Sequence, residues 1–222
     1  MSDLSQDSLL REIDEDIRRE RYAKLWKRYG AYVIAAVVAL VVAVAGYQIW
    51  KQRSLAQAEE AATSYNTAIA QARTDPQAAG DALEAIVRDG PRGYAMLAAF
   101  EQAALLAKGG DVQAARARYQ ELQGTAVDQL YRDLAVLLDA LVALEKEDLP
   151  LDADAIRARL QPLSASTNPW RFTARELTAV IDWRSGRTTE ARSQLTALAE
   201  DPQTPADTRE RARQLLSQIG AS

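Results

Sequence analysis

The sequence predicts an all-α protein in which a single transmembrane helix near the N-terminus precedes a helical-repeat domain. Three observations lead to this prediction. Alanine and leucine, both strong helix formers, dominate the composition, and the 222 residues include only 10 glycines and 7 prolines. Residues 29–50 carry no charged side chain. After residue 50, turn-forming residues recur at intervals of about one helix.

The composition excludes several classes of site. Because the chain has no cysteine, it has no disulfide framework, thiolate nucleophile or zinc–cysteine centre. The absence of histidine removes the commonest catalytic base and metal ligand. A net charge of −4 and a pI of about 5.1 disfavour nucleic acid as a partner. An aromatic content of 6% also leaves few rings for stacking on bases.

Residues 1–30 are expected to form an amphipathic helical segment in the cytosol, next to the membrane. Leu10, Ile13 and Ile17 are spaced three to four residues apart, and Leu25 and Tyr29 continue the pattern. One interpretation is a charged helix that lies at the lipid headgroups. The alternative is a docking site for a cytosolic or membrane partner.

Residues 31–50 are expected to be a transmembrane signal anchor. The uncharged run is long enough for the roughly 20 helical residues that cross a bilayer core, and it is more uniformly apolar than a buried core helix. A cleaved signal peptide is the alternative, but the residues 1–30 that precede the run, with acidic side chains among them, fit that alternative poorly. Aromatic side chains flank both ends, as they do at membrane interfaces. The predicted anchor residues are Trp26, Lys27, Arg28, Tyr29, Tyr32, Tyr47 and Trp50.

The charges on either side of this segment predict its orientation. Six lysines and arginines lie between residues 18 and 28, whereas only Lys51 and Arg53 follow the segment at a comparable distance. The positive-inside rule then places the N-terminus in the cytoplasm and the C-terminal domain on the other side of the membrane.

Residues 51–222 are expected to form an extracytoplasmic domain of helices joined by short turns. Turn-forming pairs such as Asp75-Pro76, Gly90-Pro91 and Gly109-Gly110 interrupt the apolar pattern. The expected helices are 51–74, 76–88, 92–108, 111–123, 126–147, 152–163, 169–185, 188–200 and 205–219.

Two of the turns lie in the same local sequence pattern. In LLAKGGDVQAARARYQEL, Gly110 is followed by Ala115 and Tyr119, and in DWRSGRTTEARSQLTAL, Gly186 is followed by Ala191 and Leu195. A glycine can adopt the left-handed conformation that ends a helix. The small alanine lets the second helix approach the first, and the larger residue one turn later fills the gap to the next pair.

Two further units are assigned by spacing alone. We expect Ala82 with Ile86, and Ala155 with Leu160, to occupy the corresponding positions, although neither unit has the glycine. The pattern resembles the tetratricopeptide repeat family, whose unit is a helix–turn–helix of about 34 residues. A generic helical bundle with similar Gly–Ala spacings is the alternative.

This resemblance implies a solenoid whose first helices line a concave binding surface. Trp183 and Arg184 are of most interest, because tryptophan and arginine are enriched in binding hot spots; Trp183 packed between helices as core is an equal alternative. The candidate protein-binding residues are Leu97, Phe100, Lys108, Glu176, Val180, Trp183 and Arg184.

The order of segments in the whole chain resembles a second family, the ancillary subunit of the bacterial Sec translocon. The most specific piece is the acidic-then-basic stretch that ends in Trp26-Lys27 and Tyr29-Gly30 beside the apolar segment. The resemblance implies a single-pass inner-membrane protein with a periplasmic tetratricopeptide-like domain. It also implies Sec translocon subunits, a membrane-anchored periplasmic prolyl isomerase, periplasmic chaperones and nascent secreted proteins as partners.

The sequence shows no convincing catalytic motif, so we expect a protein that is not an enzyme and has no cofactor or metal. The serines have no histidine to activate them, and Asp148, Asp152 and Asp154 lack the spacing of a calcium loop. A scaffold for cell division or outer-membrane assembly is the alternative function. Small residues from Ala35 to Gly46 also allow a homo-oligomer that packs through the membrane segment.

Overall fold

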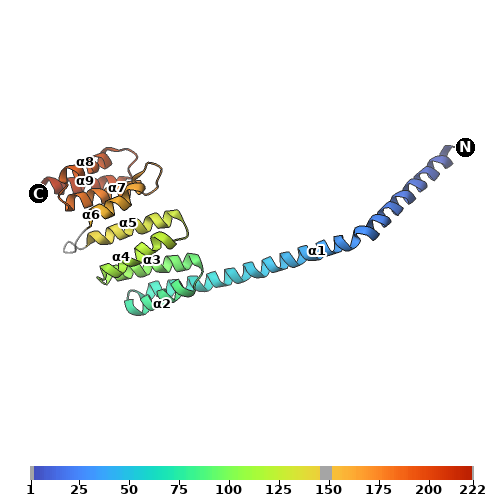
Figure 1. The fold of residues 1–222 in the computed structure, drawn as a ribbon, viewed down its shortest axis with the longest axis horizontal. Coiled ribbons are helices and arrows are strands. Elements are labelled where there is room, and N and C mark those ends of the chain that lie inside the picture. Colours follow the sequence, from blue (N-terminus) through green and yellow to red (C-terminus); the bar gives the residue numbers. More distant parts are fainter. Residues whose placement is uncertain (1–2, 146–151, 222) are drawn as a thin grey trace. The chain divides into compact units, whose positions relative to one another are not determined.

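The computed structural model describes the backbone of residues 3–145 and 152–221 and the side chains of 26–32, 34–145 and 152–220. These residues form α-helices, one short 3-10 helix (η1) and no strand (Figure 1). The elements are α1 (Asp3–Gln71), α2 (Pro76–Asp89), α3 (Arg92–Lys108), α4 (Val112–Thr125), α5 (Gln129–Glu145), α6 (Ala153–Leu160), η1 (Gln161–Ser164), α7 (Arg171–Arg184), α8 (Thr188–Glu200) and α9 (Ala206–Ala221).

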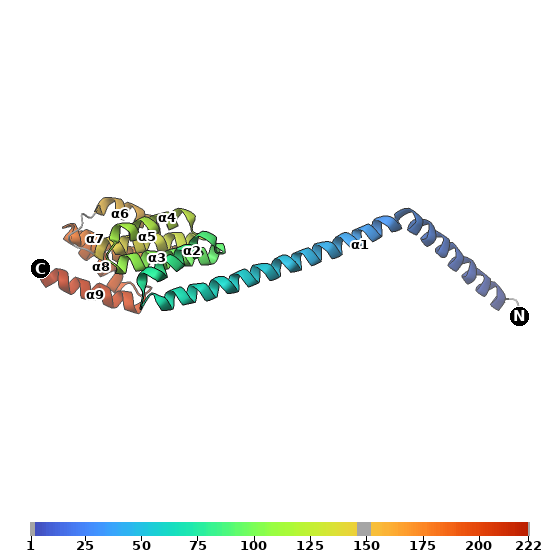
Figure 2. The ribbon, with the colours of Figure 1, turned by 90° about the horizontal axis from the view of Figure 1, so that it is seen from below.

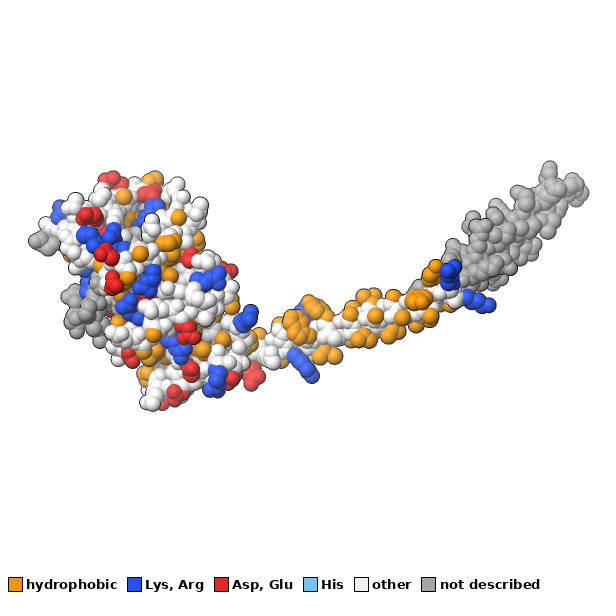
Figure 3. Space-filling model, viewed as in Figure 1, with side chains coloured by type: hydrophobic (Ala, Val, Ile, Leu, Met, Phe, Trp, Pro, Cys, Tyr) orange, Lys and Arg blue, Asp and Glu red, His pale blue; other side chains and the backbone are white. Residues whose placement is uncertain are grey.

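The chain divides into two compact units, Met1–Ala56 and Gln57–Ser222. In the first unit, the part of α1 that begins at Trp26 is long and apolar enough to cross a membrane. Its apolar side chains are exposed, with Val38 at 56% and Val42 at 66%, and Figure 3 shows them covering the helix. A core helix of a soluble protein would bury such a surface, so this segment has the character of a membrane span.

The second unit is a series of antiparallel helix pairs. The end of α1 pairs with α2, and α3–α4, α5–α6 and α7–α8 follow, with α9 at the C-terminal end (Figures 1 and 2). The buried apolar residues form four clusters that succeed one another along the chain. This is the arrangement of a solenoid, in which each repeat packs mainly on its neighbours.

Most of the helices expected from the sequence are confirmed. One difference is that the expected helix 51–74 is the continuation of α1, because no breaker separates it from the apolar segment. α5 begins at Gln129, since the Asp128 side chain accepts a hydrogen bond from the Leu130 amide. α6 ends at Leu160 and gives way to η1, where Pro162 has no amide hydrogen to donate to a continuing helix.

The turn pattern around the two glycines is confirmed. Gly110 and Gly186 have φ values of 85° and 80°, a conformation that costs other residues energy. In both turns, the amide that follows the glycine donates to a carbonyl five residues back, Asp111 to Leu106 (2.9 Å) and Arg187 to Asp182 (2.8 Å). This is the bond that closes a helix ending in a left-handed residue.

The alanine assignments in the two units without glycine are wrong, whereas Ile86 and Leu160 are buried. Ala82 is only partly buried and Ala155 is exposed, because the alanines were matched by their spacing along the chain and not by their distance from the residue that caps each helix. Counted from the residue before each second helix, the fourth and eighth residues are buried in all four units. These pairs are Ala79 and Leu83 in α2, Ala115 and Tyr119 in α4, Ile156 and Leu160 in α6, and Ala191 and Leu195 in α8.

Candidate protein-interaction surface

The predicted binding residues of α3 divide between the core and the surface. Leu97 and Phe100 are half-buried and pack against the apolar cluster that α3, α4 and α5 share. The Phe100 ring lies 6.2 Å from the Tyr119 ring and 6.4 Å from the Tyr131 ring, measured between centroids. Lys108, in the last turn of α3, is exposed.

The predicted binding residues of α7 all have contacts within the domain. Glu176 is buried and accepts two hydrogen bonds from the Arg211 guanidinium of α9, at 2.7 and 2.8 Å. These hydrogen bonds raise the pKa of Arg211. Val180 is half-buried, and so is Trp183, which packs against the apolar cluster that includes residues of α7, α8 and α9.

The Arg184 side chain ties α7 to the end of α5. Its Nη1 donates to the Leu144 carbonyl oxygen at 2.6 Å. The residues predicted on α3 and those predicted on α7 belong to different apolar clusters, and α5 lies between the two helices in the series (Figure 1). The structure therefore gathers the candidates into two groups rather than one.

Sequence reasoning did not single out two exposed leucines of α5. Leu130 and Leu141 are 42% and 46% exposed, which is unusual for large apolar side chains in this domain. They belong to a leucine series with Leu134 and Leu137, at spacings that place all four on one face of the helix. The leucine spacing was a visible signal, but without a glycine turn after α5 the repeat pattern could not be extended to this helix.

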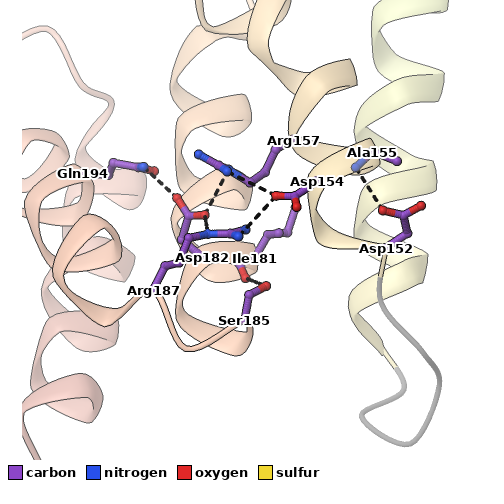
Figure 4. A network of polar contacts seen from close by, with 9 residues as sticks. All are labelled: Asp152, Asp154, Ala155, Arg157, Ile181, Asp182, Ser185, Arg187 and Gln194. Atoms are coloured by element: carbon purple, nitrogen blue, oxygen red, sulfur yellow. Dashed lines mark hydrogen bonds and ion pairs between the residues drawn. The ribbon is translucent and has the colours of Figure 1, made fainter.

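A polar cluster around Asp182 connects α6, α7 and α8 (Figure 4). The Asp182 carboxylate is fully buried and lies 2.8 Å from Arg187 Nε and 3.0 Å from Arg157 Nε. Gln194 Nε2 donates to its second oxygen at 2.8 Å. The hydrogen bond to Asp182 raises the pKa of Arg187. Below, these four residues are called the Asp182 cluster.

A second buried carboxylate with arginine and glutamine partners lies one repeat earlier. Asp139 of α5 is fully buried, and its oxygens accept hydrogen bonds from Arg116 of α4 (2.8 Å), Arg159 of α6 and, at 3.4 Å, Gln120. Arg116 and Arg157 stand five residues after the capping residues Asp111 and Asp152. The two buried acids therefore receive an arginine from the same position of the preceding repeat.

These clusters are suited to holding helices together. A buried carboxylate is tolerated when guanidinium and amide groups satisfy it, and then it is not a free acid or base. Within the described residues, no group of three or more acidic side chains is placed to hold a metal ion.

Burial, together with the charges of Glu101 and Glu145, raises the pKa of Tyr119 to about 12.

The predicted anchor residues all have exposed side chains. Trp26, Tyr32 and Trp50 are 62%, 74% and 66% exposed, and the ring centroids of Tyr47 and Trp50 are 6.1 Å apart. The Arg28 guanidinium lies 5.7 Å from the centre of the Tyr29 ring. Lys27 is exposed as well. These side chains are free to meet lipid headgroups or water at the ends of the apolar segment.

Comparison with known proteins identifies the family. Neither the curated proteins nor the solved structures contain a match. A family described as the tetratricopeptide repeat-like domain matches residues 23–197, a range that includes the apolar segment and the four helix pairs. Because this range covers most of the chain, and because the helix pairs have the buried positions described above, the protein belongs to the tetratricopeptide repeat-like domain family.

Proposed function

We propose that this protein is a membrane-anchored protein-interaction module. The observation that carries the proposal is the combination, within one family match, of an exposed apolar helix and a tetratricopeptide-like repeat domain. Repeat arrays offer extended surfaces to other proteins, and the apolar helix would restrict the module to partners at one membrane. We propose a scaffold rather than an enzyme, because the buried acids are occupied in holding repeats together.

The membrane we propose is the bacterial inner membrane, with residues 1–30 in the cytoplasm and the repeat domain in the periplasm. The six basic residues ahead of the apolar segment support this orientation. Protease added to intact spheroplasts tests it. In the proposed orientation, the repeat domain is digested without opening the cells, whereas a domain that is protected until lysis contradicts the proposal.

The setting we propose is the Sec translocon. Translocon subunits, a membrane-anchored prolyl isomerase, periplasmic chaperones and nascent secreted proteins would then be the partners. The resemblance of the segment order and of the stretch before residue 31 supports this choice. The surface we propose for these contacts combines the predicted residues that keep exposed or half-buried side chains with the exposed leucines of α5: Leu97, Phe100, Lys108, Leu130, Leu141, Val180, Trp183 and Arg184.

The experiment is a purification of the full chain from mildly solubilised membranes, followed by mass spectrometry. A variant whose residues 1–50 are replaced by an unrelated anchor is the matched control. Translocon subunits that co-purify with the natural chain and are lost with the foreign anchor support the proposal and assign specificity to the anchor. Co-purification that survives the exchange assigns specificity to the repeat domain. Recovery of a cell-division or outer-membrane assembly complex instead contradicts the Sec setting.

A further inference from the structure

A pocket of about 580 Å³ lies among α2, α3 and α4. Its apolar lining includes Val87 of α2, Ala95 and Met96 of α3, and Leu122 of α4, and Val127 beside it is 53% exposed. The α3 residues in this lining differ from Leu97 and Phe100, so this pocket is separate from the surface proposed above. Its volume is in the range of cavities that accept a bulky apolar group.

The charge at this pocket comes from the first turn of α3. Asp75, Asp111 and Asp152 cap α2, α4 and α6 by accepting a hydrogen bond from a first-turn amide, but no side chain caps α3, nor α7 or α8. The uncapped amides carry partial positive charge. Arg92 is the first residue of α3, although helix starts favour acidic side chains. An anion bound at this end would relieve the resulting electrostatic conflict.

The other charged groups of the pocket already have partners. Arg118 Nη1 donates to Glu121 at 3.2 Å, and its Nη2 donates to Glu84 at 2.6 Å. Arg92, in contrast, is exposed and has no ion pair among the described residues. The charged group at the pocket that lacks an ion pair is therefore the positive guanidinium of Arg92, and it lies next to the apolar lining.

We infer that this pocket, lined by α2, α3 and α4, binds a protein segment that places a bulky aliphatic side chain next to an aspartate or glutamate. The aliphatic group contacts Met96, Leu122 and Val127, and the carboxylate meets Arg92 and the first amides of α3. The inference rests on the proposed interaction function and adds the chemistry of one partner. A protein segment supplies both groups on neighbouring residues.

The test is a selection of random seven-residue peptides, displayed on phage, against the full chain in detergent micelles. We expect enrichment of peptides in which leucine, isoleucine or valine adjoins an acidic residue. Ala95→Trp fills the pocket and should weaken a selected peptide at least about tenfold. Arg92→Glu should select lysine or arginine in place of the acid. Arg213→Glu is the matched control, because Arg213 is an exposed arginine on α9, outside the pocket.

The outcomes are distinct. A selection without enrichment, enriched peptides that bind the Ala95→Trp chain equally well, or an acid preference that persists in Arg92→Glu overturns the inference. Thermal unfolding by circular dichroism establishes that each variant is folded; if Ala95→Trp is not, the reversal of charge preference in Arg92→Glu decides the matter. Intact recovery of partners from membranes by the Ala95→Trp chain would overturn this pocket's role while leaving the proposed function standing.

Discussion

The repeats α3–α4 and α7–α8 share a turn but differ in the residue whose carbonyl closes it. In each, a left-handed glycine precedes the second helix, and the next amide donates to the carbonyl five residues back. That carbonyl belongs to Leu106 in one repeat and to Asp182 in the other. The Leu106 side chain is half-buried against the apolar cluster of its repeat. The Asp182 side chain is fully buried and bound by two arginines and a glutamine.

The difference shows that the turn and the coupling between repeats are separate properties. Glycine conformation and a small buried alanine set the path of the chain in both repeats. The side chain at the compared position is apolar in Leu106 and ionic in Asp182, although Arg116 also joins α3–α4 to the next repeat through Asp139. An ionic cluster is the more demanding choice, because the fully buried Asp182 carboxylate depends on its arginine and glutamine partners.

The largest expected effect is that of Asp182→Ala. It leaves Gln194 without its acceptor and Arg157 and Arg187 with only Asp154 as a carboxylate partner, and we expect a loss of about 3 kcal/mol in the free energy of unfolding. Leu106→Ala, at the corresponding position, should cost about 1–2 kcal/mol, because the side chain is only half-buried. Urea unfolding of the full chains in micelles compares the two. Equal losses would contradict the distinction between ionic and apolar coupling.

The next effect concerns Tyr119 and alkaline pH. Its pKa is about 12 in the folded chain and its ordinary value is 10.0, so folding favours the neutral phenol. The associated stability is fully present below pH 10 and is lost as pH rises from 10 to 12, by as much as about 2–3 kcal/mol. Tyr119→Phe has no proton to lose and should decline less over this range. Unfolding curves measured from pH 8 to 12 provide the comparison, and parallel declines would contradict the prediction.

A smaller and equal effect is expected at the two turns. Gly110→Ala and Gly186→Ala each place a Cβ atom in a left-handed conformation, at a cost of about 1–2 kcal/mol. A Cβ atom at Gly186 meets no atom within 4 Å, so backbone strain accounts for the cost there. If the turn is independent of the coupling, thermal unfolding should show similar losses for both. Clearly unequal losses would indicate that the Asp182 cluster and the turn act together.

The smallest effect is expected for an exposed ion pair. Arg213 lies 3.5 Å from Glu210 on the surface of α9, and both side chains are about 60% exposed. Because water screens such pairs, Arg213→Ala should change stability by less than about 0.5 kcal/mol. The same urea titration measures it. A loss comparable with that of Asp182→Ala would show that ionic contacts in this domain do not depend on burial for their strength.

The sequence predicted most helix ends and both glycine turns, since these depend on local chemistry. It did not predict the contents of the core. Asp139 and Asp182 would be placed on the surface by their charge, and apart from Arg187 their arginine partners lie 20 or more residues away on other helices. Glu176 was expected to face a partner protein, but Arg211, 35 residues later, holds it buried. Such pairings depend on which helices meet, which spacing alone does not reveal.

The register of the units without glycine failed for a related reason. The spacing between alanines gives a distance along the chain. Which residues of a second helix are buried depends instead on their distance from the residue that caps that helix. Asp75 and Asp152 are those caps, and counting from them gives Ala79 and Ile156. Capping residues are therefore the better markers of repeat register in this chain.

The two acid clusters also bear on how such a protein can change in length over evolution. Arg116 and Arg157 occupy matching positions, and so do their acceptors, Asp139 and Asp182. An in-frame deletion of one repeat, from Asp139 to Ile181, would place Asp182 at the position of Asp139. Arg116 would then pair with Asp182. Duplication of the same stretch would add one more matched pair. Because the ionic pairing is shared, either change would keep each of these buried carboxylates beside an arginine of the preceding repeat.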